Sequence, residues 1–297
     1  MNNSEKGLVS VVICTRNREK SCKKAIRSVL RSFETSNLSV EIIVVDDCSD
    51  KPFTCEYNPV KVLRVKEEPV TTSIARNLGI QKAGGEITAF IDDDVLVAPT
   101  WASRLQKFSK GKTDILGGSV KPLYLSDPPD WWKEEVCNRY IAVGNIRMAN
   151  SISEEEEHTL FWSCNLAVKS YVLEEVGFDS RLGKKGSRGV TGEDTELARE
   201  AREKGYDAEL DPAFLAYHKV YPYRLQLSYL MRRAFFQGIT DSLTKGNNLE
   251  TLIRQLFCIG NSAITFPFSK LKNLLYTSTA IGRIYSFNKG KGDKDLS

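Results

Sequence analysis

AFIDDDV, residues 89–95, passes from an apolar run to three adjacent carboxylates, Asp92, Asp93 and Asp94. Adjacent carboxylates repel one another, and placing them at the end of a buried strand is costly unless a cation compensates their charge. Magnesium is often held by one or two carboxylates together with substrate phosphates. The stretch therefore predicts a strand that ends in a metal–diphosphate site. A solvated turn or a helix N-cap is the alternative, because aspartates are common in both.

The segments around this stretch alternate between apolar runs and helical patterns. LVSVVIC, residues 8–14, and VEIIVV, residues 40–45, are the β-branched runs expected of strands that are covered on both faces. The predicted strands are 8–14, 40–45, 60–65 and 86–91, and the predicted helices between them are 25–33 and 71–83. This order predicts an α/β fold with a mostly parallel central sheet flanked by helices.

Polar clusters follow three of these predicted strands. Thr15 and Arg16 come after the first strand, Asp46 and Asp47 after the second, and the three aspartates after the fourth. Ligands of parallel α/β sheets bind outside the carboxyl ends of the strands, so we expect these clusters to converge at one edge. The first turn has no GxGxxG pattern, which disfavours a dinucleotide-binding site.

The composition excludes several classes of protein. The 42 basic and 38 acidic residues leave a net charge of +4, too small to indicate a nucleic-acid partner. The seven cysteines are scattered and form no CxxC pair, which favours reduced thiols in the cytosol over disulfides or a zinc site. No signal peptide or spanning helix is predicted from the hydropathy. We therefore expect a cytoplasmic protein.

Two stretches in the middle of the chain have open interpretations. Residues 121–160 contain prolines, an acidic run and the pair Trp131-Trp132, and we expect an irregular insertion there. Its aromatic residues form either a satellite core or a platform for a sugar. The glycine-rich basic segment 183–189 is either a loop that closes over phosphate or a plain exposed loop.

Later polar residues also allow two interpretations each. Glu193 and Asp194 open a predicted helix that runs to Glu203, where acidic residues either stabilise the first turn or supply a general base. His218 follows a predicted strand, 209–217, and is either structural or a ligand.

The C-terminal region, 222–297, is predicted to be helical and basic, whereas 1–221 is predicted to form the main domain. Such a region can lie on an anionic membrane surface, cover the main domain or form a homodimer contact, and the sequence leaves all three open. The last segment, 288–297, is expected to be disordered.

Several motifs in order resemble family 2 glycosyltransferases of the GT-A fold. These motifs are SVVICTRNR, VVDDCSD, ARNLGI, FIDDDV, SCNLAVKS, GFDSRLG, GEDTELARE and a late histidine, and they span about residues 8–220. The resemblance implies the GT-A, or nucleotide-diphospho-sugar transferase, fold. The helical C-terminal region is predicted from its own pattern and carries none of these motifs. The resemblance also implies transfer of a sugar from a nucleotide-diphospho-sugar.

The resemblance assigns roles residue by residue. The nucleotide-binding residues that it implies are Thr15, Arg16, Asp46, Asp47, Arg76, Asp92 and Asp93. The implied metal ligands are Asp94 and His218, for a divalent manganese or magnesium ion, and the implied general base is Asp194. The residues expected on the sugar or acceptor side are Asn165, Glu193, Trp131 and Trp132, with the insertion 121–160 facing the acceptor.

The chemistry agrees with an inverting, metal-dependent glycosyltransferase. A divalent ion stabilises the leaving diphosphate, and inversion needs one base, for which Asp194 is the best candidate. We expect a UDP-sugar donor and a glycan or lipid-linked acceptor in surface polysaccharide or glycoconjugate synthesis. A peripheral position on the cytoplasmic face of the membrane is one of the roles left open for the C-terminal region. The alternatives are a sugar-nucleotide nucleotidyltransferase, which the glycine-free turn CTRNR disfavours, and a non-catalytic nucleotide- or glycan-binding module.

Overall fold

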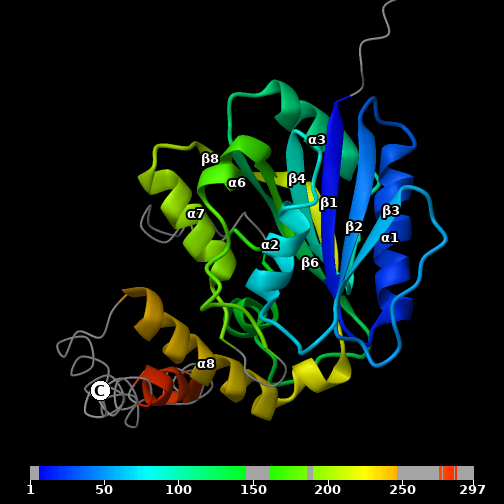
Figure 1. Cartoon of the computed structure of the whole chain (residues 1–297). Coiled ribbons are helices and arrows are strands. Elements are labelled where there is room, and N and C mark those ends of the chain that lie inside the picture. The colour runs from blue at the N-terminus through cyan, green and yellow to red at the C-terminus, as the bar shows by residue number, and fades with distance from the viewer. Residues whose placement is uncertain are drawn as a thin grey trace, which may run out of the picture. The chain divides into compact units, whose positions relative to one another are not determined.

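A computed structural model describes residues 7–144, 161–185, 190–245, 274–275, 277–283 and 285 (Figure 1). The chain forms two compact units. The first comprises Met1–Leu123, Ala142–Arg181 and Glu193–Lys219, and the second comprises Tyr124–Ile141, Leu182–Gly192 and Val220–Ser297. The longest segment of the second unit begins next to the domain boundary predicted between residues 221 and 222.

Among the described residues, eight strands form one sheet in the order β3-β2-β1-β4-β7-β6-β8-β5. They are β1 (Leu8–Thr15), β2 (Ser39–Asp47), β3 (Val60–Val65), β4 (Ile87–Asp92), β5 (Val95–Val97), β6 (Ile115–Tyr124), β7 (Asn165–Lys169) and β8 (Ala208–Val220). The first four strands are parallel, as the alternating pattern predicted. β7 pairs antiparallel with β4 and β6, and β5 pairs antiparallel with β8, so the sheet is mixed.

The register of the parallel strands brings their polar ends together. Thr15 at the end of β1 lies opposite Asp46 on β2, and Cys14 lies opposite Asp92 on β4. The expected convergence of the strand-end clusters at one edge of the sheet is therefore present. Most of the preceding residues of these three strands are buried, and most are β-branched, as expected for strands that are covered on both faces.

Helices cover both faces of this sheet. They are α1 (Glu19–Phe33), α2 (Thr72–Ile80), α3 (Trp101–Lys110), α6 (Ser170–Glu175) and α7 (Glu193–Glu203). The second unit contains α4 (Glu134–Cys137), α8 (Leu227–Lys245) and the 3-10 helices η1 (Asn138–Ile141) and η4 (Pro222–Leu225). Alternate residues of β1 serve the two faces: Val11 packs in the core with α1 and α3, whereas Val12 packs in the core with α2, α6 and α7. Gly79 allows α2 to approach β1, because a Cβ there would lie 2.5 Å from a Val12 methyl group.

Some elements differ from the sequence-based prediction. β5 was not predicted, because three residues are too few to show a period. The segment predicted as an irregular insertion begins inside β6 and also contains α4 and η1. Residues 145–160, 186–189, 246–273 and 288–297 lie outside the described residues, so the predictions for these segments stay untested.

The second unit contains two helices that pack closely. A Cβ on Gly238 of α8 would lie 1.8 Å from the carbonyl oxygen of Thr279, and a Cβ on Gly282 would lie 2.0 Å from that of Phe235. Glycine is therefore required at this crossing. Leu243 and Ile281 are exposed apolar side chains of this unit. None of the helices that the structure describes is long and apolar enough to cross a bilayer.

Candidate active site

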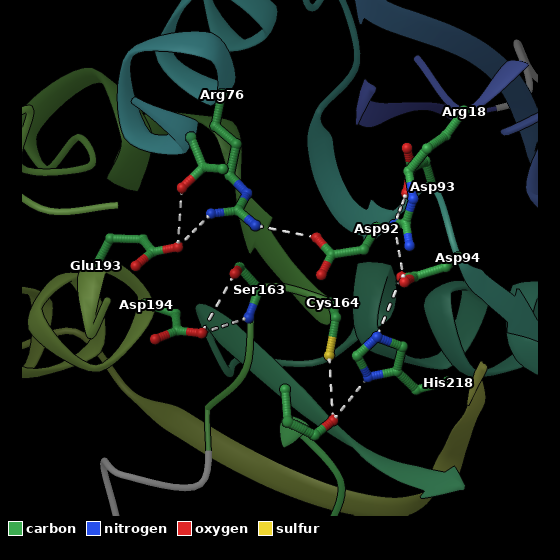
Figure 2. Close-up of polar contacts among 12 residues, drawn as sticks. Arg18, Arg76, Asp92, Asp93, Asp94, Ser163, Cys164, Glu193, Asp194 and His218 are labelled. Carbon is green, nitrogen blue, oxygen red and sulfur yellow. Dashed lines mark hydrogen bonds and ion pairs between the residues drawn. The ribbon is translucent and has the colours of Figure 1, made fainter. Parts of the chain in front are cut away.

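The polar residues of the candidate site come from five parts of the first unit. Figure 2 shows the three aspartates at the end of β4, Arg18 before α1, Arg76 on α2, the acidic pair at the start of α7 and a histidine on β8. The register of β5 and β8 places Val95 opposite His218, which explains how the histidine reaches the aspartates. The long-range contacts described below hold these groups in one cluster.

Asp93 is buried and is bonded on both carboxylate oxygens. The Thr15 hydroxyl donates to its Oδ2 at 2.8 Å, and Arg18 Nη1 donates to its Oδ1 at 2.8 Å. Burial, followed by the charge of Asp94, raises the pKa of Asp93 to about 6. The contact with Thr15 is consistent with the prediction that both residues line the same site.

Asp94 lies between Arg18 and His218. Arg18 Nη1 donates to its Oδ2 at 2.9 Å, and His218 Nε2 lies 3.1 Å from its Oδ1. The other ring nitrogen of His218 lies 3.2 Å from the carbonyl oxygen of Ala142. A carbonyl only accepts, so this contact assigns the proton of a neutral imidazole to Nδ1 and leaves the Nε2 lone pair facing Asp94.

This arrangement fits a divalent cation. One ligand atom each from Asp92, Asp94 and His218 lies within 4.8 Å of the others. In the neutral imidazole, the Nε2 lone pair and Asp94 Oδ1 face each other and could both serve as ligands of one cation. An imidazole that ligates a metal usually donates its other N–H to a carbonyl or carboxylate, as His218 does to Ala142. Carboxylate oxygens suit magnesium and manganese.

Arg76 connects the metal-side carboxylates to the start of α7. Its guanidinium donates to Asp92 at 3.1 Å and to Glu193 Oε1 at 2.8 Å, and it lies over the ring of Phe178. Burial opposes the charge of Arg76, but the charges of Glu193 and Asp92 raise its pKa above the ordinary value. Arg76 was predicted to flank the nucleotide, and the structure places it between the two acidic groups.

Asp194 is held in a fixed orientation at the first turn of α7. Its Oδ2 accepts from the Ser163 backbone N–H at 2.9 Å and from the Ser163 hydroxyl at 3.2 Å, and its Oδ1 accepts from Thr195 N–H at 2.9 Å. Burial, followed by the charge of Glu193, raises the pKa of Asp194 to about 6. A carboxylate with this pKa is ionised at neutral pH and still accepts a proton readily.

Glu193 has one oxygen in the Arg76 ion pair and one without a partner. Among the described residues, its buried Oε2 accepts no hydrogen bond. A buried acceptor of this kind is costly unless a ligand satisfies it. This atom is therefore a candidate contact for a ligand hydroxyl.

The two aspartates at the end of β2 have different environments. Asp46 is fully buried and accepts from Arg64, from Phe53 N–H and from Ser49 N–H. This set of protein partners favours a structural role over the nucleotide contact predicted for Asp46. Asp47 accepts from Val70 N–H and remains partly exposed, so it is the better nucleotide candidate.

Arg16 lies directly after β1 at the same edge of the sheet. Its side chain is half-buried, and within the described part of the chain it makes no hydrogen bond or ion pair. An unpaired cation at this edge is available to an anionic ligand, so Arg16 stays a predicted nucleotide contact.

Asn165 is fully buried, and its side-chain amide is hydrogen-bonded to other residues of the protein. Its Oδ1 accepts from Trp101 Nε1 at 2.9 Å, and its Nδ2 donates to the carbonyl oxygens of Ser119 and Phe214 at 3.1 and 2.7 Å. These bonds join three segments around β7. The geometry favours a structural role for Asn165 over the predicted sugar contact.

Trp131 and Trp132 belong to the second unit. Trp132 is buried and packs edge-on against Tyr124, whereas Trp131 is 39% exposed. Packing is therefore the supported interpretation for Trp132. Trp131 stays a predicted acceptor contact.

Two contributing residues were not identified from the sequence. Ser163 holds Asp194 through its N–H and its hydroxyl, and Arg18 bridges Asp93 and Asp94. Both lie inside motifs that carried the family resemblance, SCN and CTRNR. Their partners are distant in the chain, so their presence in these motifs was the available signal.

The sequence is similar to a known protein family and to several curated proteins. Residues 10–177 match the model of the family described as glycosyl transferase family 2. A glucosyl-dolichyl phosphate glucuronosyltransferase of Haloferax volcanii is 28% identical over 242 residues, covering 77% of this chain and 75% of that protein. The glycosyltransferase AglE of the same organism is 26% identical over 224 residues, covering 72% of this chain and 68% of that protein.

One solved structure shares the fold over most of the chain. It is the mannosyltransferase PcManGT from Pyrobaculum calidifontis in complex with GDP-Man and Mn²⁺, with a TM-score of 0.59 and 15% identity. The match covers 96% of this chain and 88% of that protein. At this level of identity the similarity shows the fold alone.

Proposed function

The chain belongs to glycosyl transferase family 2 and has the GT-A fold, and from this premise we propose that it is an inverting, metal-dependent transferase. It would move a sugar from a nucleoside-diphosphate sugar to an acceptor hydroxyl. The observation that carries this proposal is that a candidate base and a candidate metal site are connected in one cluster. Asp194 is a carboxylate whose pKa is raised to about 6, and Arg76 and Glu193 link its helix to the acid–imidazole cluster around Asp94.

At the donor end, Asp92, Asp94 and His218 would hold a manganese or magnesium ion. The bound ion would supply positive charge to the diphosphate as it leaves. Arg16 and Asp47 are the proposed nucleotide contacts. Arg16 follows β1 and Asp47 ends β2 at the same edge of the sheet, and both are partly exposed. The nucleotide proposed for the donor is UDP.

At the acceptor end, Asp194 would take the proton of the attacking hydroxyl. Ser163 fixes Oδ2 through two hydrogen bonds, so the carboxylate is already oriented before the acceptor binds. Inversion requires a single base on the face of the sugar opposite the leaving group. The unpartnered Oε2 of Glu193, on the neighbouring residue, is the proposed acceptor of a hydrogen bond from a sugar hydroxyl.

The acceptor is proposed to be a lipid-linked sugar or a growing glycan in glycoconjugate or polysaccharide synthesis. One relative is named a glucosyl-dolichyl phosphate glucuronosyltransferase, which supports a lipid-linked acceptor of this kind. A second is named a succinoglycan biosynthesis protein of Rhizobium meliloti. Trp131 offers an exposed aromatic face for the acceptor. We propose that the protein acts in the cytoplasm, peripherally on the cytoplasmic face of the membrane.

A nucleotide panel tests the donor. We expect one nucleoside diphosphate, UDP or GDP, to raise the melting temperature of the full chain only when Mn²⁺ is present, and the monophosphates to raise it less. The reason is that a metal held by carboxylates binds best when diphosphate oxygens complete its ligands. Thermal shift measured with UDP, GDP, CDP and their monophosphates, with and without Mn²⁺, checks this.

Other results of the same panel have defined meanings. No stabilisation by any nucleotide would contradict the transferase proposal. Release of a nucleoside triphosphate when pyrophosphate is added to a sugar nucleotide would favour a nucleotidyltransferase. Binding of a sugar nucleotide without hydrolysis or transfer to any acceptor would favour a non-catalytic binding module.

The pH dependence of transfer tests the base. Asp194 accepts a proton only when it is ionised, and its pKa is about 6. We therefore expect kcat/KM to be constant above this pKa and to fall about tenfold per pH unit below it. Asp93 has a similar pKa, so nucleotide binding must be measured over the same range. If nucleotide binding declines at the same pH as kcat/KM, the loss of activity at low pH comes from the aspartate cluster and not from the base.

A further inference from the structure

Arg18 places a positive charge on the two buried aspartates of the candidate metal site. A single atom, Nη1, lies 2.8 Å from Asp93 Oδ1 and 2.9 Å from Asp94 Oδ2 (Figure 2). The carboxylates are almost inaccessible, whereas the Arg18 side chain is 31% exposed. Arg18 also lies directly before α1, in the turn that follows β1. It therefore has both a buried partner and a route to the solvent side.

The Arg18 guanidinium is hydrogen-bonded to Asp94, which is also a candidate metal ligand. Asp94 Oδ2 accepts a hydrogen bond from Arg18, and Oδ1 faces His218 Nε2, so the guanidinium occupies one of the two oxygens that a metal could use. A divalent ion bound by Asp94 and His218 would place a second positive charge beside Arg18. Two positive charges that share one buried carboxylate repel each other strongly. Arg18 in this position therefore competes with the metal for the charge of Asp94.

A second cation lies on the same side of the cluster. Lys219 is buried, and its ammonium donates to the Ser21 hydroxyl at 3.1 Å. Its backbone N–H donates to the carbonyl oxygen of Asp94 at 3.0 Å, so the residue lies beside the aspartates. Arg18 and Lys219 therefore place two cationic side chains next to this cluster. An anion with several oxygens, such as a diphosphate, complements these two cations.

We propose that Arg18 is a positioning residue with two successive partners. In the donor-free protein it neutralises Asp93 and Asp94. When a metal and a nucleoside diphosphate bind together, the metal takes over the charge of Asp94, and Arg18 turns to the diphosphate oxygens. The inference rests on the proposed function, because the second partner is the diphosphate of the donor.

This exchange couples the two ligands. Metal alone must compete with Arg18 and binds weakly, whereas metal with diphosphate binds well because the diphosphate provides Arg18 with a new partner. Each ligand then increases the affinity for the other by the same factor, as thermodynamic linkage requires. The Arg18 side chain is therefore the group that couples metal binding to diphosphate binding.

Arg18→Gln in the full chain tests this inference by binding alone. We expect the Kd for Mn²⁺ without nucleotide to fall about tenfold, because the competing cation is gone. We expect the Kd for UDP, or for GDP if that is the diphosphate bound, to rise about tenfold at saturating Mn²⁺. The Kd for the corresponding monophosphate should change much less. Titration calorimetry and the free-Mn²⁺ electron paramagnetic resonance signal measure these constants.

Two further variants separate the exchange from a structural role. Arg31→Gln removes the same charge from an exposed residue in the last turn of the same helix, and we expect no change in either constant. Arg18→Lys keeps the charge and should lie between the wild type and Arg18→Gln. If Arg18 only maintains the fold of the site, Arg18→Gln will weaken both Mn²⁺ and diphosphate binding, and this overturns the inference.

The two proposals fail in different ways. If the wild-type chain binds neither UDP nor GDP in the presence of Mn²⁺, the proposed function and this inference are both overturned. If the wild type binds a diphosphate but Arg18→Gln lacks the opposite shifts in the two constants, the inference alone is overturned.

Discussion

Replacing Asp194 with asparagine is expected to lower the rate of sugar transfer about 10³-fold while the Kd for the donor nucleotide stays within about twofold of the wild type. An amide cannot take the proton of the acceptor hydroxyl, so the loss falls on the chemical step. The asparagine Oδ1 can still accept the two hydrogen bonds from Ser163 that orient the side chain, whereas the Thr195 N–H loses its side-chain acceptor. The comparison therefore removes the basicity of residue 194 with little change in the shape of the site.

The experiment measures release of the nucleoside diphosphate with a panel of polyprenyl-phosphate sugars and aryl glycosides, using the best acceptor of the wild type. Glu203→Gln is the matched control, because it makes the same type of change at an exposed residue of the same helix. We expect that control to transfer at the wild-type rate. Near-normal transfer by Asp194→Asn would contradict the assignment of the base. A loss of donor binding in that variant would indicate that residue 194 supports the donor site instead.

Replacing Asp94 with asparagine is expected to raise the Kd for Mn²⁺ in the presence of nucleoside diphosphate by more than about 100-fold. The substitution removes a negative charge that lies against His218 Nε2 and Arg18. The remaining candidate ligands, Asp92 and His218, are too few to hold a hard cation well. The thermal stabilisation by diphosphate and Mn²⁺ should disappear with the metal affinity.

Titration of Mn²⁺ into the purified variant measures this effect directly, without a transfer assay. Asp207→Asn removes one carboxylate charge from an exposed residue of the same unit and should leave Mn²⁺ binding unchanged. The melting temperature of Asp94→Asn without ligands shows whether the variant is folded. A folded variant with wild-type affinity for Mn²⁺ would contradict the metal site at Asp94.

The alternation of strands and helices was predictable because it depends on local periodicity. The β-branched runs of β1, β2 and β4 and the amphipathic pattern of α1 each report their own segment, and the structure has these elements where they were expected. The parallel order then places the polar residues after these strands at one edge. β5 was missed for the opposite reason, since its three residues are recognisable only through their pairing with β8.

The identities of the candidate site residues were partly predictable. Asp94 and His218, the metal ligands that the resemblance implied, lie with Asp92 within reach of one ion, whereas Asp92 was expected to contact the nucleotide. Asp46 looked equivalent to Asp47 in the sequence, but the register of β2 and β3 places Arg64 opposite Asp46 and pairs the two charges. That pairing depends on how two strands align, which a run of two aspartates does not reveal.

The sequence by itself determined the fold class, the family and the types of side chain gathered at the strand ends, because hydrophobic periodicity and short motifs are local properties. Only the tertiary structure decided which of those side chains are already paired. Asn165 is occupied by Trp101 and two carbonyl groups, and Arg18 is brought to Asp93 and Asp94 from more than seventy positions earlier in the chain. Partners so distant in sequence meet only through strand register and packing, and those contacts determine whether a charge stabilises the protein or remains available to a ligand.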